Sequence, residues 1–523
     1  MFLKTVKNHE AVCTGRDLHY IPLFPENIHD VIMNGTNLSY IGENGFDNLT
    51  KITLKKLYLN DNLILYIHPH SFTKLIYLGK IYISDEKRLN VDILKTGLGF
   101  STKEKLTDLI FDYNSWSYLP LDMFSNFTRN HVAKLRIKGN TFPEVKCNTF
   151  SPLNNLFDMS LSENLIERLD MTGIPGAIRK LHLDNNLLPT VPDWCVQAKR
   201  NTSAVQYLAY LDLSYNSIGY IKDDSLGCLP KLEMLVLNGN PIGRIYNNIF
   251  TNNPILYTVR MSKIGYPLRK IDDFAFNSSS LSNLNMQETN FHFDLGNFNP
   301  TSIFSLSPNL TFLYLDQSYL PKTEIRMQQM FSSLIKLKVL SLSSGSLAFL
   351  PKNVFPNLKS LDTLSLSANR LSSWNDGNAV FRNMTSLRKL YLSNNYIRII
   401  NETTFPFEVL NSLKELDLSR NPYACSCDQL WFTEWMKTTH VKLIMYPLFY
   451  RCRQPPELDN MVLQKYAESK MQCPPWNPLY SMAIVLSCSG LLLVTFITIG
   501  LKCQTNIKNY IYLWRVTYNR RKG

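Results

Sequence analysis

Leucines and polar residues alternate along this chain in a phrase that returns at a nearly constant interval. From Leu211 to Asn216 the spacing is L-x-L-x-x-N, with two leucines one residue apart and an asparagine three residues later. The last position of the phrase falls at residues 36, 62, 86, 114, 140, 164, 186, 216, 240, 264, 289, 318, 345, 369, 395 and 421. These sixteen positions lie 22 to 30 residues apart, and ten are asparagine. The pattern predicts a repeat architecture over residues 28–421.

Each phrase predicts one short strand, because side chains alternate between the two faces of a strand and the leucines share one face. Leucine-rich repeats have this period, and their strands pair in parallel from turn to turn. The asparagine amide is expected to satisfy buried backbone groups of adjacent turns. Ile218, Ile221, Leu226 and Leu229 exemplify the residues that fill the convex side. The predicted fold is an α/β leucine-rich-repeat solenoid, a horseshoe with a parallel concave β-sheet about 75 Å long.

Four cysteines after the last repeat predict a disulfide cap over residues 422–475. Cys425 and Cys427 are too close to pair comfortably with each other, and Cys452 and Cys473 follow. The last turn of a solenoid exposes apolar core, so it needs a cap. We expect Cys425 to pair with Cys452 and Cys427 with Cys473, although sequence does not prove connectivity. A four-thiolate zinc site is the alternative, and the C-x-C spacing disfavours it.

The other cysteines before the apolar segment carry weaker signals. Residues 1–27 resemble part of an N-terminal repeat cap, and Cys13 lacks the upstream cysteine with which such caps usually pair it. Cys195 and Cys228 lie on the convex side of neighbouring turns, and a disulfide and two free thiols are equally compatible with the sequence. Cys147 has no obvious partner.

Residues 481–501, "SMAIVLSCSGLLLVTFITIGL", are 21 uncharged residues, the length a helix needs to cross a bilayer. A buried core helix is the alternative. Trp476 and Tyr480 flank one side as interface anchors, and the tail at 502–523 has six basic residues and no acid. This bias predicts a single-pass type I membrane protein with a cytoplasmic tail. The tail charges act either as a stop-transfer signal or on anionic lipid, and Cys503 is a candidate acylation site.

Composition adds two points. The net charge is +13, of which the tail contributes six, leaving 13 − 6 = +7 for the first 501 residues, too dilute to imply a nucleic-acid partner. Nine N-x-[ST] glycosylation sequons precede the apolar segment, at Asn34, Asn37, Asn48, Asn126, Asn201, Asn277, Asn309, Asn383 and Asn401. They suit an extracellular glycoprotein. The start "MFLKTVKNHE" shows no apolar signal-peptide region, so we expect an export signal upstream.

The segments "NPYACSCDQLWFTEWMKTTHV", "YRC" and "MQC", followed by one span and "NYIYLWRVTYNRRKG", resemble the Toll-like receptors with a single cysteine cluster next to the membrane. The resemblance implies an innate-immune pattern-recognition receptor at the plasma or endosomal membrane. Its ectodomain would bind a microbial or damage-associated ligand and form a homo- or hetero-dimer with another Toll-like receptor. The family carries a TIR domain that recruits adaptors, whereas this chain ends at Gly523. The expectation is therefore a fragment, a decoy or a dominant-negative form, with an adaptor partner only if the full-length protein has a TIR domain.

Registers 264 to 345 lack the asparagine and contain an insertion, "FHFDLGNFNPTSIFSLSPNL". Irregular turns open gaps between layers, and in similar receptors such places host ligands. Phe291, Phe293, Phe298 and Phe304 are therefore candidate ligand-binding residues. The alternative, which the density of apolar residues favours, is that they pack in the convex core.

Function is open between two classes that share the fold. The cap motif and the Trp-Arg segment favour the receptor, and the alternative is a leucine-rich-repeat adhesion or cell-surface interaction protein. An enzyme is not expected, because the G-x-S-x-G, H-E-x-x-H and Walker motifs are absent from the sequence. We expect no catalytic residue, metal site or cofactor.

Overall fold

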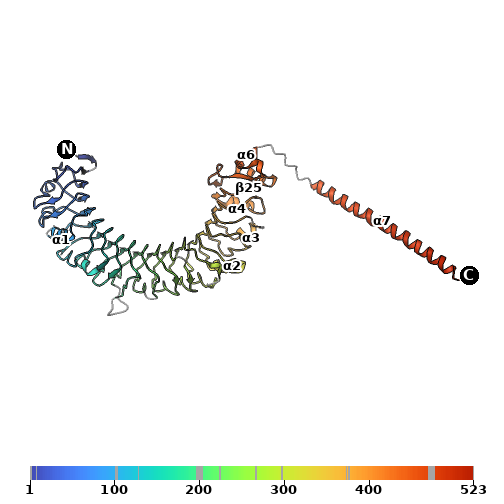
Figure 1. Cartoon of the computed structure of the whole chain (residues 1–523), viewed down its shortest axis with the longest axis horizontal. Coiled ribbons are helices and arrows are strands. Elements are labelled where there is room, and N and C mark those ends of the chain that lie inside the picture. Colours follow the sequence, from blue (N-terminus) through green and yellow to red (C-terminus); the bar gives the residue numbers. More distant parts are fainter. Residues whose placement is uncertain are drawn as a thin grey trace. The chain divides into compact units, whose positions relative to one another are not determined.

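The computed structural model describes residues 3–7, 9–99, 104–127, 129–195, 204–222, 225–265, 268–295, 298–372, 374, 377–468 and 478–521. The chain divides into two compact units, Met1–Tyr466 and Ala467–Gly523. The first unit is an arc of stacked turns, with helices α1 (Val91–Gly99) and α2 (Glu324–Phe331) on its outer side (Figure 1). The predicted leucine-rich-repeat solenoid is confirmed.

One sheet of nineteen strands runs through the described part of the first unit. In order of pairing the strands are β1 (Leu3–Lys7), β2 (Glu10–Thr14), β3 (Asp30–Asn34), β5 (Lys56–Asn60), β7 (Lys80–Ser84), β8 (Asp108–Ile110), β9 (Lys134–Arg136), β11 (Asp158–Ser160), β13 (Lys180–His182), β14 (Tyr210–Asp212), β15 (Met234–Val236), β17 (Thr258–Arg260), β19 (Asn283–Asn285), β20 (Phe312–Tyr314), β21 (Val339–Ser341), β22 (Thr363–Ser365), β23 (Lys389–Tyr391), β24 (Glu415–Asp417) and β26 (Lys442–Leu443). Only the pair β1–β2 is antiparallel, and every later pair is parallel.

Four two-stranded parallel sheets and several short helices complete the turns. The sheets pair β4 (Tyr40–Ile41) with β6 (Tyr66–Ile67), β10 (Glu144–Lys146) with β12 (Arg168–Asp170), β16 (Arg244–Ile245) with β18 (Lys270–Ile271), and β25 (Pro422–Ala424) with β27 (Arg451–Gln454). The other helices that begin in this unit are α3 (Gly377–Phe381), α4 (Phe407–Ser412), α5 (Leu430–Thr438) and α6 (Leu463–Glu468). Five 3-10 helices cover Asp47–Lys51, Cys147–Phe150, Phe293–Leu295, Cys427–Gln429 and Pro456–Leu458.

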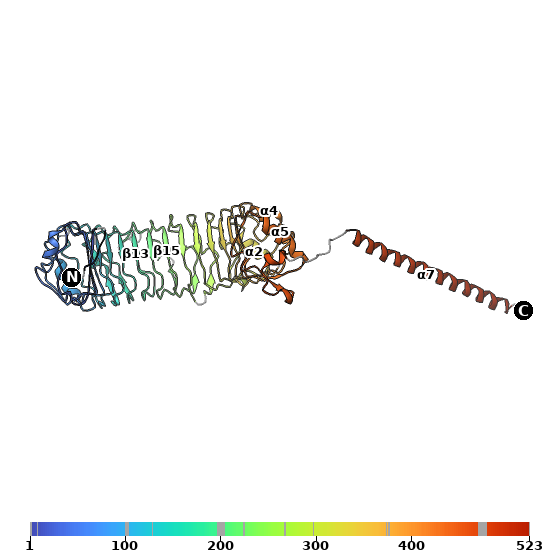
Figure 2. The same ribbon diagram turned by 90° about the horizontal axis from the view of Figure 1, so that it is seen from above.

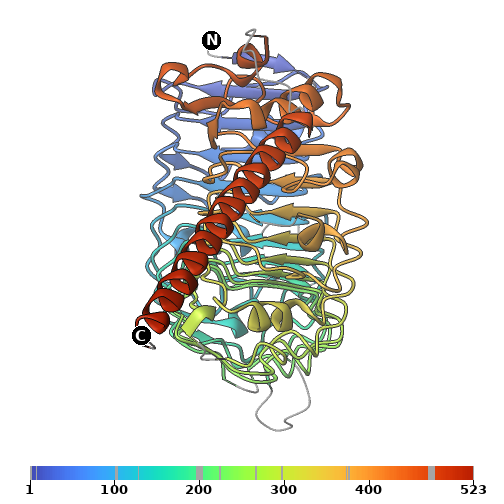
Figure 3. The same cartoon turned by 90° about the vertical axis from the view of Figure 1, so that its right-hand side faces the viewer.

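The leucines of the phrase lie in register across the sheet. Leu181, Leu211 and Leu235 occupy matching positions on consecutive strands, and all three are buried. Figures 2 and 3 show the strands stacked one behind another along the solenoid. Because each strand is short and each leucine pair points inward, one continuous apolar core extends along the whole unit.

The inward asparagines form a ladder of hydrogen bonds, as the sequence predicts. The Asn216 amide nitrogen donates to the carbonyl of Leu213 in its own turn at 3.0 Å and to that of Leu183 in the preceding turn at 2.9 Å. Its amide oxygen accepts the backbone N–H of Leu188 at 3.0 Å. The same three kinds of bond recur at Asn240, Asn369, Asn395 and Asn421. We call the inward asparagines the amide ladder.

The backbone at the residue before each of the sixteen register positions is left-handed, with φ between +53° and +70°. Glycine occupies this place at Gly35, Gly139 and Gly239 only. At Gly139 a Cβ would lie 2.1 Å from the Tyr113 ring, and at Gly239 it would lie 2.4 Å from the Tyr215 ring. Close approach therefore requires these two glycines, since other residue types adopt the same left-handed φ at most of the registers.

The four irregular registers connect their turns differently. Ile264 is fully buried, the Thr289 and Ser318 hydroxyls lie 3.3 Å apart, and a Cβ at Gly345 would lie 2.6 Å from a backbone oxygen. Here, hydrogen bonds between turns are made by polar side chains that point away from the core. We call this set the rim ladder. It consists of Asn238, Ser262, Asn285, Gln287, Asp316, Ser343 and Ser365.

The cap contains the expected Cys425–Cys452 disulfide, with Cα atoms 5.6 Å apart. Cys427 is also disulfide-bonded, and Cys473, its expected partner, lies outside the described residues. A further disulfide joins Cys195 to Cys228. Two cysteines of this unit, Cys13 and Cys147, are free and buried.

The second unit is helix α7 (Pro478–Asn519), which contains the apolar segment 481–501. Within it the segment Val485–Tyr518 is long and apolar enough to cross a membrane, judged by length and composition. The 21 uncharged residues span about 31 Å at 1.5 Å per residue, close to the thickness of a bilayer core.

Candidate interaction surface

The concave face of the sheet is built from the residues that flank and separate the leucines. On each strand the leucines turn into the core, so the residues between them are presented on the concave face. Side chains on this face lie one strand apart, about 4.8 Å from their neighbours, and consecutive turns set them in rows. The face therefore brings together residues that are 22 to 30 positions apart in the sequence.

Charged residues of both signs line the first of these rows. Lys56 pairs with Asp30 at 2.6 Å, and the hydrogen bond between them raises the pKa of the Lys56 ammonium. The same row contains the ion pairs Lys80–Asp108 at 3.1 Å and Lys134–Asp158 at 3.0 Å. Each carboxylate is largely buried and each ammonium is partly exposed, so this row satisfies its own charges.

Tyrosines stack beside this row. The rings of Tyr58 and Tyr82 lie 4.1 Å apart and nearly parallel, and burial together with the neighbouring tyrosine raises the pKa of Tyr58. Further along the face, burial and a hydrogen bond to Glu415 raise the pKa of Tyr391 to about 12. Both tyrosines are therefore neutral at physiological pH. They give the face apolar surface with a polar edge.

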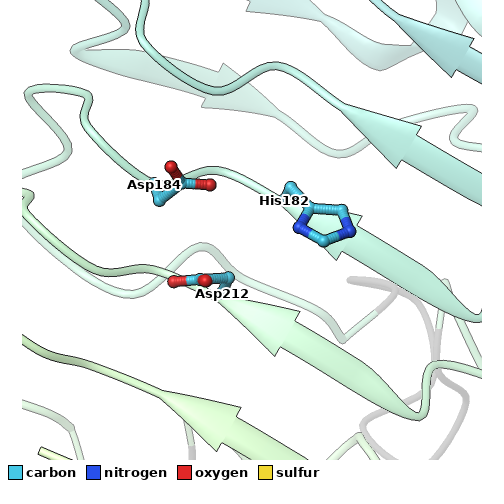
Figure 4. Close-up of side chains that lie close together, drawn as sticks. All are labelled: His182, Asp184 and Asp212. Atoms are coloured by element: carbon cyan, nitrogen blue, oxygen red, sulfur yellow. The ribbon is translucent and has the colours of Figure 1, made fainter.

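A cluster of acidic residues around His182 lies on the middle strands (Figure 4). His182 ends β13, and Asp212, its register partner, ends β14. One imidazole nitrogen of His182 and one carboxylate oxygen each of Asp184 and Asp212, the atoms that could ligate a metal ion, lie within 4.8 Å of one another. The His182 Nε2 atom is also 3.8 Å from a carboxylate oxygen of Asp158. Three carboxylates therefore surround one imidazole.

Local bonds hold these carboxylates in place. Asp184 accepts the hydroxyl of Ser162 at 2.6 Å, and Asp212 accepts the backbone N–H of Ser214 at 2.9 Å. Neither has an ion-pair partner among the described residues, whereas Asp158 is paired with Lys134. The cluster thus presents two carboxylates without an ion pair on the concave face. It can attract a cationic group of a partner molecule.

The four candidate ligand-binding phenylalanines are core residues in the structure. Phe291, Phe293 and Phe304 are at most 1% exposed, and Phe298 is 7% exposed. The Phe291 and Phe293 rings meet edge to face at 4.6 Å, and Phe293 meets Phe298 at 5.1 Å. These four phenylalanines therefore pack in the convex core, as the alternative interpretation of the sequence holds. They are not ligand-binding residues, because a buried ring offers no surface to a ligand.

Eight of the nine predicted glycosylation sites lie among the described residues. Asn201 lies outside the described residues. The other eight sequon asparagines are all at least partly exposed, with Asn34 and Asn126 the most open. Asn34 ends β3 and borders the concave face, so a glycan there would cover the edge of that face.

Sequence reasoning missed the acidic cluster. His182, Asp184 and Asp212 fall at variable positions of two consecutive phrases, "LHLDNN" and "LDLSYN". Aligning those variable positions across registers, as the strand pairing requires, brings them together. The signal was therefore present in the repeat alignment and not in any contiguous motif.

The family model described as "Leucine rich repeat" matches residues 199–242 and 373–422. Human Toll-like receptor 3 is 27% identical over 271 residues, covering 48% of this chain and 28% of that protein. Lumican of Coturnix japonica is 29% identical over 211 residues, covering 39% of this chain and 56% of that protein. The chain thus spans less than two thirds of the length of either relative.

Among solved structures, a chain of the Drosophila Toll–Spatzle complex aligns over 87% of this chain and 63% of its own length. The TM-score is 0.58 and the identity is 20%, so this likeness concerns the fold. The structural neighbours are leucine-rich-repeat proteins, and the sequence relatives include a receptor and lumican. Together they support a receptor or an interaction protein built from leucine-rich repeats.

Proposed function

We propose that this chain is the ligand-binding part and membrane anchor of an innate-immune receptor that resembles the Toll-like receptors. The observation that carries the proposal is the order of parts: a solenoid, a disulfide cap, and then a helix apolar enough to cross a membrane. The similarity to human Toll-like receptor 3 over 48% of this chain also favours a receptor. The ligand is a microbial or damage-associated molecule, and binding pairs two chains.

The concave face is the proposed ligand surface. Its middle strands present the carboxylates of Asp184 and Asp212, which have no ion pair among the described residues, and its first strands present the stacked rings of Tyr58 and Tyr82. Loops and exposed faces carry function more often than the packed scaffold does. A ligand with a cationic group and an apolar part matches this distribution.

The proposed orientation places the solenoid outside the cell and the basic tail inside. Six basic residues without an acid follow the apolar segment, and basic residues accumulate on the cytoplasmic side of membrane helices. The eight described sequon asparagines are exposed or half-buried, which suits the proposed attachment of glycans on the outside of the cell.

Expression of the tagged chain behind a heterologous signal peptide tests this proposal. We expect N-glycosidase to lower its apparent mass and external protease to cut the solenoid but spare a C-terminal tag. Purified chain should then bind a microbial extract component, and Asp184→Asn with Asp212→Asn should weaken that binding at least tenfold. A glycan-free chain with an externally accessible C-terminal tag contradicts the proposal.

The second candidate is an extracellular interaction protein, and the similarity to lumican favours it. The transcript beyond the codon for Gly523 separates the two candidates. An open frame that encodes a TIR-like sequence supports the receptor. A stop codon at that point supports the interaction protein.

A further inference from the structure

A pocket of about 440 Å³ opens beside the last turn of the solenoid, and its lining shares no residue with the concave rows described above. Its wall contains three arginines, Arg420, Arg451 and Arg453, and two aromatic rings, Tyr396 and Phe449. Arg420 precedes the last inward asparagine, whereas Arg451 and Arg453 belong to β27 of the cap. The pocket therefore forms only where the cap folds against the final repeat. Its volume lies within the range of small-molecule sites.

Arg420 and Arg451 are each held in place by contacts that leave some of their guanidinium N–H donors unused by the described residues. The backbone N–H of Arg420 donates to the Phe449 carbonyl at 2.7 Å, and its guanidinium carbon lies 4.8 Å from the centre of the Phe449 ring. The Arg451 side chain donates from Nε to the Leu448 carbonyl at 2.8 Å and from Nη1 to the Asn460 carbonyl at 2.9 Å. Because a guanidinium has five N–H donors, Arg451 retains others that are unused by the described residues.

The charges around the pocket do not cancel. Arg453 pairs with Asp459 at 3.2 Å. Arg420 and Arg451 have no carboxylate partner among the described residues, since the contacts of Arg451 are to neutral carbonyls. Three arginines thus line one cavity with one carboxylate beside them. Like charges brought together repel, and a bound anion removes that repulsion.

We propose that this pocket binds a phosphate or sulfate ester whose organic part contains a ring. Arginine is the side chain best suited to tetrahedral oxyanions, because its planar fork donates two parallel hydrogen bonds to adjacent oxygens. The cavity is larger than a single anion needs, since a water molecule occupies about 30 Å³ in the liquid.

The space beside the arginines fits the ring of such an ester. The Tyr396 side chain lines the pocket and is 56% exposed, so one of its surfaces is open to a ligand. Phe449 already lies under the Arg420 guanidinium. A ligand ring can therefore stack on Tyr396 while its ester oxygens meet the arginines. This inference does not depend on the proposed receptor role, because the pocket shares no residue with the concave rows.

The full chain in detergent micelles tests the proposal by calorimetric titration at low salt with phenyl phosphate, phenyl sulfate, inorganic phosphate, inorganic sulfate and phenol. We expect at least one aryl ester to bind at least tenfold more tightly than its inorganic anion and than phenol. Added sodium chloride should weaken that binding, because the interaction is between charges. Preference for phenyl phosphate identifies a phosphate source, and preference for phenyl sulfate identifies a sulfate source.

Matched variants locate the site. Arg451→Gln and Arg420→Gln should each lower the affinity for the bound ester about tenfold, and Tyr396→Ala should lower it without changing the affinity for the inorganic anion. Arg388→Gln removes the same charge just before β23 and should leave binding unchanged. Unchanged thermal unfolding of Tyr396→Ala, an exposed position, shows that the cap remains folded. Esters that bind no better than phenol, or wild-type affinity in the arginine variants, overturn the proposal.

Discussion

Two stretches of the same solenoid hold their turns together in different places. Around registers 186, 216 and 240, each turn places an asparagine amide in the core and bonds it to two carbonyls and one N–H. Around registers 264, 289, 318 and 345 the inward residue has no amide, and the rim ladder on the surface carries bonds between turns. The strands of both stretches pair in the same parallel register.

The difference shows that the parallel sheet and the leucine core define the turn, while the polar connection between turns can move. Water does not reach an inward amide, so no water molecule can take over its hydrogen bonds when the side chain is removed. The buried backbone groups that it bonded are then left without a partner. A rim bond is reached by water, which substitutes when a partner is removed. The amide ladder should therefore contribute more stability per residue than the rim ladder.

The largest expected effect is at the amide ladder. Asn216→Ala removes bonds to Leu183, Leu213 and Leu188 and leaves buried backbone groups unsatisfied. We expect the free energy of unfolding to fall by about 4 kcal/mol, since each unpaired buried group costs about 1–3 kcal/mol. Thermal unfolding of the full chain, and faster amide hydrogen exchange at Leu188, measure the effect.

Ser214→Ala provides the matched control for that change. Ser214 lies in the same turn and is buried, and its hydroxyl has no hydrogen-bond partner among the described residues. Its removal should change the free energy of unfolding by less than about 0.5 kcal/mol. A loss at Ser214 equal to that at Asn216 would contradict the assignment of stability to the amide.

A smaller loss is expected at the rim ladder. Asp316 accepts hydrogen bonds from Gln287, Ser341 and the backbone N–H of Ser343. Asp316→Ala should lower the free energy of unfolding by about 2 kcal/mol, because water replaces part of what is lost. Asp316→Asn keeps one acceptor oxygen and should lose less. If Asp316→Ala costs more than Asn216→Ala, the comparison between the two ladders is wrong.

Sequence periodicity was enough to predict the sheet, the amide ladder and the solenoid, because leucine and asparagine are required at fixed spacing by burial and by bonding. It was not enough to predict the rim ladder. Ser262 and Asp316 occupy variable positions, and their partners belong to other turns. The left-handed position was also hidden, because residues other than glycine, such as Tyr113, Lys263 and Arg420, occupy it in most turns.

The candidate sites show the same limit. The sequence marked Phe291 and Phe293 because they sit in an insertion, yet the structure buries them, since the added turn needs apolar volume. It did not mark the His182 cluster or the three-arginine pocket. Both are assembled from turns or cap segments that meet only in three dimensions, so register and cap folding must be known first.

Glu86 tests the amide ladder through pH. It occupies an inward position and accepts the N–H of Ile64 at 2.9 Å and that of Asn62 at 2.7 Å, but a carboxylate cannot donate as an amide does. Burial raises its pKa above the ordinary 4.5. Between the unfolded and the folded pKa, the folded chain holds a proton that the unfolded chain lacks. The contribution of Glu86 to stability therefore falls as pH rises through that window, and is restored on acidification.

Glu86→Asn should raise the free energy of unfolding by about 1 kcal/mol at pH 7, because it restores a donor and removes a buried charge. The gain should shrink on acidification, as wild-type Glu86 takes up a proton and loses its charge. Subtracting the two stability curves isolates Glu86 from other carboxylates, such as Glu163, whose pKa is lowered by hydrogen bonds from Tyr113 and Lys138. A difference that grows on acidification would refute the assignment.

The smallest effect concerns the left-handed position that both stretches share. Ala368 precedes an inward asparagine, is exposed, and has φ of +55°. Ala368→Gly removes left-handed strain of about 1–2 kcal/mol and adds back about 0.5–1 kcal/mol of backbone entropy, so we expect a gain of about 0.5 kcal/mol. Ala379→Gly, the same change within helix α3 (Gly377–Phe381), should destabilise instead, because no left-handed strain is relieved there. Opposite shifts in the melting temperature of the two variants would show that the backbone is strained at the left-handed position, whichever of the two ladders connects the turns.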